Sequence, residues 1–103
     1  MKSLYIDDNR PTPEGYTRTA RTFEEARKLI VEEDWDLISF DHDLGEEEIR
    51  ANGLTLMNIL EDHVFIGLRK APLVNVHTAN AAARPAMRMC AERILNMWEK
   101  QNG

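Results

Sequence analysis

The sequence contains a single cysteine, Cys90, and only 7% of its residues are aromatic. One thiol cannot form an internal disulfide, and it cannot build a metal site from several cysteines. No apolar run approaches the ~20 residues that a membrane-spanning helix needs. The first residues, Met1–Asp8, become acidic too early for a secretory signal peptide. We therefore expect a cytoplasmic protein with no membrane partner.

Positive charge is also scarce, because 13 Lys and Arg residues face 18 Asp and Glu residues and the net charge is −5. A protein that binds duplex DNA without sequence preference needs a basic surface for its phosphate contacts. Duplex DNA is therefore disfavoured as a partner. The length of 103 residues, of which 43% are hydrophobic, suits one core. We expect residues 1–103 to form a single domain.

Strand-like and helix-like segments alternate along the chain. Four segments have the apolar, β-rich character of strands: Ser3–Asp7, Tyr16–Ala20, Trp35–Asp41 and Leu73–Thr78. Three helices are predicted, from the N-cap Thr22 to about Glu33, from Gly53, and from about Arg84–Pro85. This alternation predicts a parallel sheet in an α/β layered fold. The connection after the first strand is too short for a helix, so the direction of the second strand stays open.

Polar residues gather where three of the predicted strands end. Asp7–Asp8 end the first strand, Asp41–Asp43 the third, and His77–Asn80 the fourth. Ligands bind outside the carboxyl ends of the strands in open parallel sheets, so these side chains are candidates for one site. Taken singly, each has a plain structural interpretation as a turn residue, a cap, a solvated loop residue or a buried histidine. Their convergence at one edge favours function.

Carboxylates that lie close together repel one another unless a cation or a proton is shared between them. Oxygen ligands of this kind suit Mg²⁺, which commonly keeps several waters and uses one or two carboxylates. We therefore expect Mg²⁺ as the cofactor.

Several of these segments resemble a two-component receiver domain: Leu4–Asp8, Leu37–Asp41, Asn52–Gly53 and Val74–Ala79. The resemblance implies that Asp7 and Asp8 are the acidic metal-binding pair, Asp41 the phosphoacceptor and Thr78 the switch hydroxyl. The sequence departs from that pattern twice. It lacks the first helix of a receiver, and it lacks the fifth strand with its Lys-Pro. The phosphate-binding lysine of receivers therefore has no counterpart here.

The sequence is more similar to the cyclic-phosphate processing receiver domains, over about residues 3–94. The motifs that carry this similarity are Asp7–Pro11, Pro13–Tyr16, Ile38–Gly45, Asn52–Gly53 and Val76–Asn80. Only Asn9, where an acid is expected, and Ala81, where a proline is expected, depart from the pattern. The resemblance implies a reduced receiver-like (flavodoxin-like) three-layer sandwich, with a four-stranded, mostly parallel sheet. It also implies processing of cyclic phosphates on RNA ends or nucleotides.

Hydrolysis of a cyclic phosphodiester needs a base, an acid and positive charge at the phosphate. His42 and His77 are candidates for the base and the acid, in either assignment, and Asp41 joins them as a catalytic residue. Asp7, Asp8 and Asp41 are the expected Mg²⁺ ligands. Strand alternation places His77 and Thr78 on opposite faces, so the strand must bend there for both to reach one ligand.

The remaining candidates are expected to bind the substrate. The guanidinium fork of Arg10 matches phosphate oxygens, and Arg84 lies at the start of the last helix, where the dipole favours anions. Asp43, Thr78 and Asn80 complete this group, the last two as hydrogen-bond donors. The expected partner is a phosphate-containing small molecule or an RNA end.

Two other functions remain open at this point. The chain is alternatively a degenerate signalling receiver that is phosphorylated on Asp41, although the missing lysine argues against it. It is alternatively a non-catalytic protein that keeps the fold and acts only through a protein partner.

Overall fold

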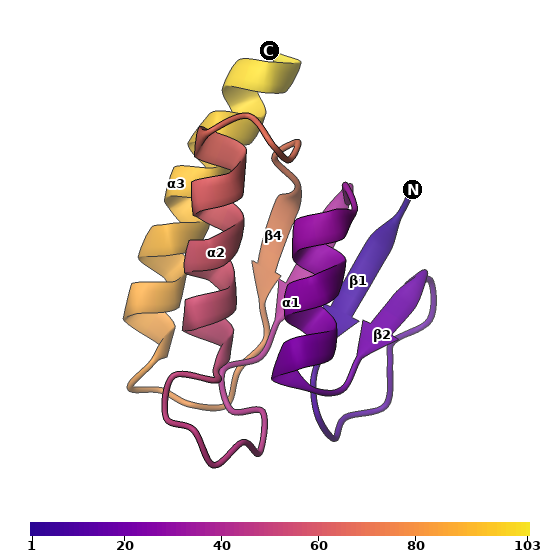
Figure 1. Cartoon of the computed structure of the whole chain (residues 1–103), viewed down its shortest axis with the longest axis vertical. Helices are drawn as coiled ribbons and strands as arrows, with labels where there is room; N and C mark the ends of the chain where they lie inside the picture. The colour runs from indigo at the N-terminus through magenta and orange to yellow at the C-terminus, as the bar shows by residue number, and fades with distance from the viewer.

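Four short strands form one parallel sheet in the computed structural model, which describes residues 1–103 (Figure 1). The strands are β1 (Ser3–Ile6), β2 (Arg18–Ala20), β3 (Leu37–Phe40) and β4 (Leu73–Val76). Their order across the sheet is β2-β1-β3-β4, and every neighbouring pair is parallel. The direction of the second strand, which the sequence left open, is therefore parallel to the first.

The connection from β1 to β2 returns along the sheet in extended form, because a parallel partner must start at the opposite end. Extended chain covers up to ~3.3 Å per residue, so residues 7–17 are long enough without a helix. The Thr17 amide donates to the Ser3 carbonyl at 3.0 Å, and the Ser3 amide donates to the Thr17 hydroxyl at 2.9 Å. These bonds set the start of β2 beside the start of β1.

Three helices begin where the sequence predicted them. They are α1 (Phe23–Glu32), α2 (Gly53–Phe65) and α3 (Arg84–Asn102). Thr22 caps α1 by accepting from the Glu25 amide at 3.1 Å, and Asn52 caps α2 by accepting from the Thr55 amide at 3.0 Å. None of the helices combines the length and the apolar character that crossing a bilayer requires.

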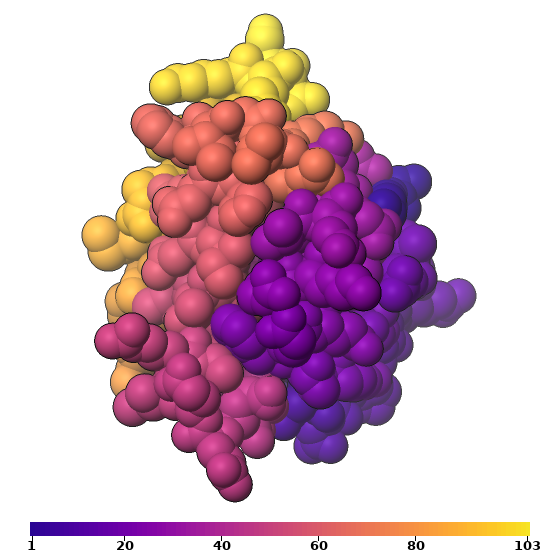
Figure 2. Space-filling model, viewed as in Figure 1, coloured from indigo at the N-terminus to yellow at the C-terminus, as the bar shows by residue number.

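The helices form one layer on one face of the sheet. α1 connects β2 to β3, and α2 connects β3 to β4, and both connections run in the same direction across the sheet. Because such connections are right-handed, α1 and α2 lie on the same face. α2 packs against both α1 and α3. In Figure 1, α1 and α2 lie side by side towards the viewer, while β1 and β2 remain visible beside α1, and in Figure 2 the residues of α1 and α2 form much of this face of the molecule. The sequence analysis expected a reduced sandwich of three layers, and the structure keeps that fold with two, because the missing first helix would have covered the other face.

The two faces of the sheet differ in chemistry. Apolar strand residues such as Leu4, Ile6 and Phe40 join the single hydrophobic core beneath the helices. The alternating positions on the opposite face are Tyr5, Ser39 and Asn75, which lie side by side in register. The Tyr16 ring from the β1–β2 connection packs edge-on against the Tyr5 ring, with centroids 5.2 Å apart. The helix-free face is thus aromatic and polar, and it leads to the strand ends.

Candidate functional site

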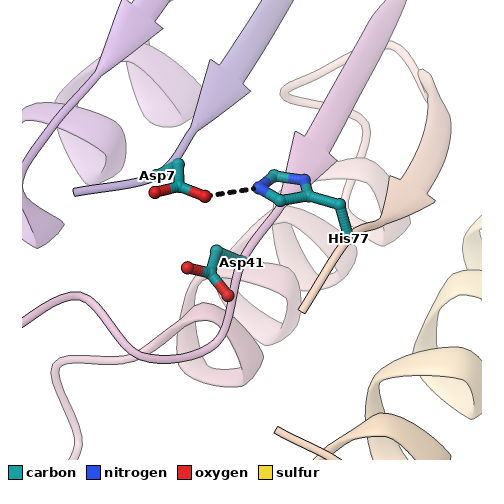
Figure 3. A group of neighbouring side chains, drawn as sticks. All are labelled: Asp7, Asp41 and His77. Atoms are coloured by element: carbon teal, nitrogen blue, oxygen red, sulfur yellow. Dashed lines mark hydrogen bonds and ion pairs between the residues drawn. The ribbon is translucent and has the colours of Figure 1, made fainter. Parts of the chain in front are cut away.

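Asp7, Asp41 and His77 come together at the carboxyl edge of the sheet (Figure 3). Each follows the last residue of a strand, and these last residues pair in register as Ile6, Phe40 and Val76. The next residue of each strand therefore reaches the same place. A ligand atom of each of the three residues lies within 4.8 Å of those of the other two. The structure thus brings together one residue from each of the three strand ends that the sequence analysis expected to converge, although in neither of the predicted metal or catalytic sets.

Asp7 is held almost completely out of solvent, with 1% of its surface exposed. Its Oδ1 accepts hydrogen bonds from the backbone amides of Asn9 at 2.9 Å and Arg10 at 2.8 Å. Its Oδ2 lies 3.1 Å from Nε2 of His77. Burial alone would raise the pKa of the Asp7 carboxyl, but these three hydrogen bonds outweigh burial and lower it. Asp7 is therefore a carboxylate at neutral pH.

The pKa of the Asp41 carboxyl is shifted in the opposite direction, because it is raised. Burial raises the pKa of the Asp41 carboxyl, against the lowering effect of hydrogen bonds from the His42 amide and the Thr78 hydroxyl, and the charge of Asp7 raises it further. The His42 amide donates to Oδ1 of Asp41 at 2.8 Å. Two neighbouring carboxylates, one of them disfavoured as an anion, form a site that a cation would stabilise.

The His77 ring is held in place by contacts with Tyr5, Ser39 and Asp7. It stacks on Tyr5 with ring centroids 4.4 Å apart and an interplanar angle of 9°, and its Nδ1 lies 2.6 Å from Oγ of Ser39. Burial lowers the pKa of His77, against the hydrogen bond and the negative charge of Asp7, which raise it. Since β4 ends at Val76, His77 and Thr78 follow the strand, which lets His77 contact Asp7 while Thr78 contacts Asp41.

A second cluster lies in the segments that follow the same strands. His42 Nδ1 lies 2.9 Å from Oδ1 of Asp43, and the Asn80 amide group donates to both Asp43 oxygens at 3.3 and 3.4 Å. The hydrogen bond from His42 is the main cause of the lowered pKa of Asp43. His42 and Asp43 also line a cavity of about 490 Å³ together with residues 44–49, 51 and 52. His42 therefore contacts Asp43 and Asn80, and it does not belong to the group of Asp7, Asp41 and His77.

Asp8 lies apart from the neighbouring carboxylates. It is exposed, and its Oδ2 lies only 2.9 Å from where a Cβ on Gly45 would sit. Gly45 has φ of +68°, a left-handed conformation that glycine adopts without strain. The close approach places Asp8 against the loop after β3, outside the cluster formed by Asp7, Asp41 and His77.

The two predicted phosphate-binding arginines brace the backbone of the site. Arg10 Nη1 donates to the His77 carbonyl at 2.7 Å, and its Nε lies 3.9 Å from Oδ2 of Asp7. Arg84 Nη2 donates to the Thr78 carbonyl at 3.0 Å. The Arg10 side chain remains 46% exposed, so it keeps donors available to solvent.

Four contributors to the site were missed from the sequence: Tyr5, Ser39 and Asn75 on the helix-free face, and Arg21. Arg21 Nη1 donates to the backbone carbonyls of Asp7 at 3.0 Å and Arg10 at 2.6 Å, which holds the turn after β1. The available signal was one polar or amphipathic residue in each of three apolar strands. The pattern can be recognised as part of a site only once the strand register places these residues in one row.

The lowered pKa of His77 predicts a pH dependence of stability. The unfolded chain takes up this proton near the ordinary value of 6.5, whereas the folded protein takes it up only at lower pH. Protonation therefore favours unfolding, and the free energy of unfolding falls as the pH drops below about 6.5, by at most ~1.4 kcal/mol per pH unit. Urea unfolding in EDTA between pH 7.5 and 5.5 measures this, and His77→Gln should remove that part of the slope. An identical slope in the variant would contradict the prediction.

The fold and the acidic strand-end site define a receiver-like domain. The profile of the cyclic-phosphate processing receiver domain matches residues 2–93, and the chain belongs to that family. A response regulator protein from Burkholderia pseudomallei, whose crystal structure contains a phosphorylated aspartic acid, a calcium ion and citrate, is 26% identical to the chain with a TM-score of 0.63. That alignment covers 98% of this chain and 71% of the other. A search of curated proteins finds no match.

Proposed function

We propose that the domain hydrolyses cyclic phosphates on RNA ends or nucleotides, with Mg²⁺ held by Asp7 and Asp41. The observation that carries the proposal is the position of a carboxylate pair beside a His42–Asp43 pair at one edge of the sheet. The His42 amide bonds to the Asp41 carboxylate, so the two groups adjoin through the backbone. The name of the family points to the same chemistry.

The donor set fits a small divalent cation. Oδ2 of Asp7 and the Asp41 carboxylate supply two oxygens, and Mg²⁺ is commonly bound by one or two carboxylates together with waters and substrate phosphates. Burial, and to a smaller extent the charge of Asp7, raise the pKa of Asp41, so a cation bound to both carboxylates would favour its ionised form. When bound, the ion would neutralise charge that develops on the phosphate. Asp8 stays outside this pair in the structure.

His42 is the residue best placed to act as the base. The Asp43 carboxylate only accepts hydrogen bonds, so Nδ1 of His42 carries the proton and the lone pair of Nε2 remains available. Nε2 takes a proton from water as the water oxygen attacks phosphorus. One ester P–O bond breaks, and the freed alkoxide takes a proton from solvent. His77 is a poor acid at neutral pH because burial lowers its pKa.

The substrate phosphate is held by groups that lie between the two clusters. The Thr78 hydroxyl lies close enough to Asp41 to lower the pKa of its carboxyl, and it accepts from the Asn80 amide at 3.0 Å. The side chain of Asn80 reaches Asp43. Arg10 presents its exposed donors from the other side, beside Asp7.

A panel of 2′,3′-cyclic nucleotides and cyclic-phosphate-ended RNA tests the proposal. Hydrolysis to a phosphomonoester should require Mg²⁺, stop in EDTA, and fall at least ~100-fold in Asp41→Asn, which removes a ligand. Asp62→Asn, an exposed carboxylate on α2, serves as the matched control and should retain activity. The absence of turnover on every substrate with Mg²⁺ would contradict the proposal.

The same preparations distinguish the signalling alternative, which the similarity to a response regulator with a phosphorylated aspartate favours. Labelling by acetyl phosphate that disappears in Asp41→Asn would identify a phosphoacceptor. Two of the four lysines argue against it, since Lys2 bonds to Glu33 and Lys70 to Asp36. Asp36 precedes β3, so Lys2 and Lys70 lie at the opposite end of the sheet from Asp41.

A further inference from the structure

The outer edge of β4 is an open edge of the sheet. β4 is the last strand in the order β2-β1-β3-β4, so only β3 pairs with it. The amides of Leu73 and His77 donate to carbonyls on the β3 side at 2.9 and 3.0 Å. Because the backbone groups of successive residues alternate between the two edges of a strand, the N–H and C=O groups of Val74 and Val76 point away from β3. The edge thus presents two donors and two acceptors that have no strand partner.

This edge lacks the features that protect the other one. Native proteins protect sheet edges with very short strands, with charged side chains or with proline in the strand. β2, at the opposite edge, has three residues and begins with the exposed Arg18. β4 has four residues, Leu73–Val76, none of them charged and three of them half-buried. An unprotected edge of this kind is suited to receive a further strand.

The helix α3 covers the space into which that strand would fit. In Figure 1, α3 lies beyond β4, on the side away from β1. A cavity of about 340 Å³ between them is lined by Leu73–Val76 of β4 and by Arg88, Ala91, Glu92 and Leu95 of α3. A strand residue in a sheet takes a space of about 3.3 Å by 4.8 Å by 10 Å, so the cavity holds at least two of them.

Two charged side chains of α3 indicate what the strand would carry. Arg88 and Glu92 are exposed, and neither belongs to the ion pairs of the structure. They lie one turn apart, about 6 Å along the helix axis. Side chains two residues apart on a strand are separated by about 6.6 Å. A basic and an acidic residue at this spacing would therefore meet Glu92 and Arg88 together, while apolar neighbours contact Ala91 and Leu95.

A second copy of the chain does not fit this edge. Two β4 strands that paired with each other would bring both α3 helices over the shared edge, because each α3 reaches past its own β4. The two helices would compete for the same space. The edge instead suits a strand that has no helix above it.

We propose that an extended segment of another protein adds to β4 as a fifth strand beneath α3. Its backbone pairs with Val74 and Val76, and a basic and an acidic side chain two residues apart pair with Glu92 and Arg88. The proposal does not depend on whether the domain hydrolyses cyclic phosphates.

Two capped peptides serve as probes. α3 runs opposite to β4, so Val-Thr-Lys-Thr-Asp-Thr-Val matches Glu92 and Arg88 as a parallel strand, and the reversed sequence matches them as an antiparallel strand. Amide hydrogen exchange should be fast at Val74 and Val76 in the free protein and slower at Leu73 and His77, which are already bonded. One of the peptides should slow exchange at Val74 and Val76 by ~10-fold or more. Backbone N-methylation of its three central residues should abolish binding, because it removes the pairing donors.

A charge swap tests the side-chain pairs. Because each probe is the other with Lys and Asp exchanged, Arg88→Glu combined with Glu92→Arg should reverse the preference between them, by ~10-fold in fluorescence anisotropy titrations. Glu99→Arg combined with Lys100→Glu is the matched control, since both residues are exposed on α3 beyond the cavity. It should keep the native preference.

Four results would overturn the inference. They are the absence of binding by either peptide up to about 1 mM, binding that leaves exchange at Val74 and Val76 unchanged, an unaltered preference in the folded charge-swap variant, and protection of Val74 and Val76 that rises with protein concentration without peptide. The last result would show that a second copy occupies the edge.

Discussion

Replacement of His42 by alanine is expected to lower the turnover of a cyclic phosphate by about 10²- to 10⁴-fold, the usual contribution of a general base. The loss should appear in kcat, because in the proposed mechanism His42 acts on the attacking water while the carboxylates hold the metal. Asp43→Asn should cause a smaller loss, since the amide no longer fixes the proton on Nδ1. Steady-state kinetics on the best substrate of the panel, at saturating Mg²⁺, measures both effects.

His63→Ala provides the matched control for His42→Ala. His63 is a half-buried histidine in the last turn of α2, and its Nδ1 bonds to the Ile59 carbonyl of its own helix. It lies at the end of α2 remote from the loop after β3, so its loss should leave turnover unchanged. Wild-type turnover in folded His42→Ala would remove His42 from the mechanism and leave the metal site to be judged separately.

The second large effect is structural and concerns Gly53, where α2 begins against the end of β3. A Cβ built on Gly53 would lie 1.8 Å from the Asp41 carbonyl oxygen and 3.0 Å from Cα of His42. The Gly53 amide also donates to the His42 carbonyl at 2.9 Å. Gly53→Ala must therefore displace the backbone that carries two candidate site residues. We expect a loss of about 3 kcal/mol or more in the free energy of unfolding.

The sign of this effect is informative. Alanine forms helices better than glycine by about 1 kcal/mol, so without the close contact Gly53→Ala would stabilise the protein. Gly67→Ala is the comparison, because Gly67 has φ of +81° with open space around it; it should cost only about 1–2 kcal/mol of backbone strain. Urea denaturation of both variants measures the two effects. A stabilised Gly53→Ala would show that α2 does not approach Asp41 so closely.

Most of the fold was predictable because local signals agreed with one another. Thr22 and Gly53 marked helix starts that the structure confirms, and the lost first helix and fifth strand were visible as missing segments. The meeting of Asp7, Asp41 and His77 was also predictable, since parallel strands in register deliver the residues that follow them to one edge. The expectation of three layers did not hold, because without the first helix only one face of the sheet is covered by helices.

The rest depended on geometry that the sequence does not encode locally. His42 directly follows Asp41, yet its side chain joins Asp43 and Asn80, because the chain has left the strand and turns there. Ser39 and Asn75 looked like ordinary strand residues until the register placed them beneath His77. The contact of Arg10 with the backbone carbonyl of His77 also could not be predicted from the sequence, because it depends on how the turn after β1 folds back.

The helix-free face connects the Asp7 carboxylate to solvent through Asn75, Ser39 and His77, in addition to the edge of the sheet. In a sheet covered on both sides, the row that ends at His77 would be sealed beneath a helix. Here Asn75 is open to solvent at the outer end of that row. A solute or another macromolecule that binds the Asn75 amide would act on Ser39, His77 and Asp7 from this face, without entering the edge where we propose that the substrate binds.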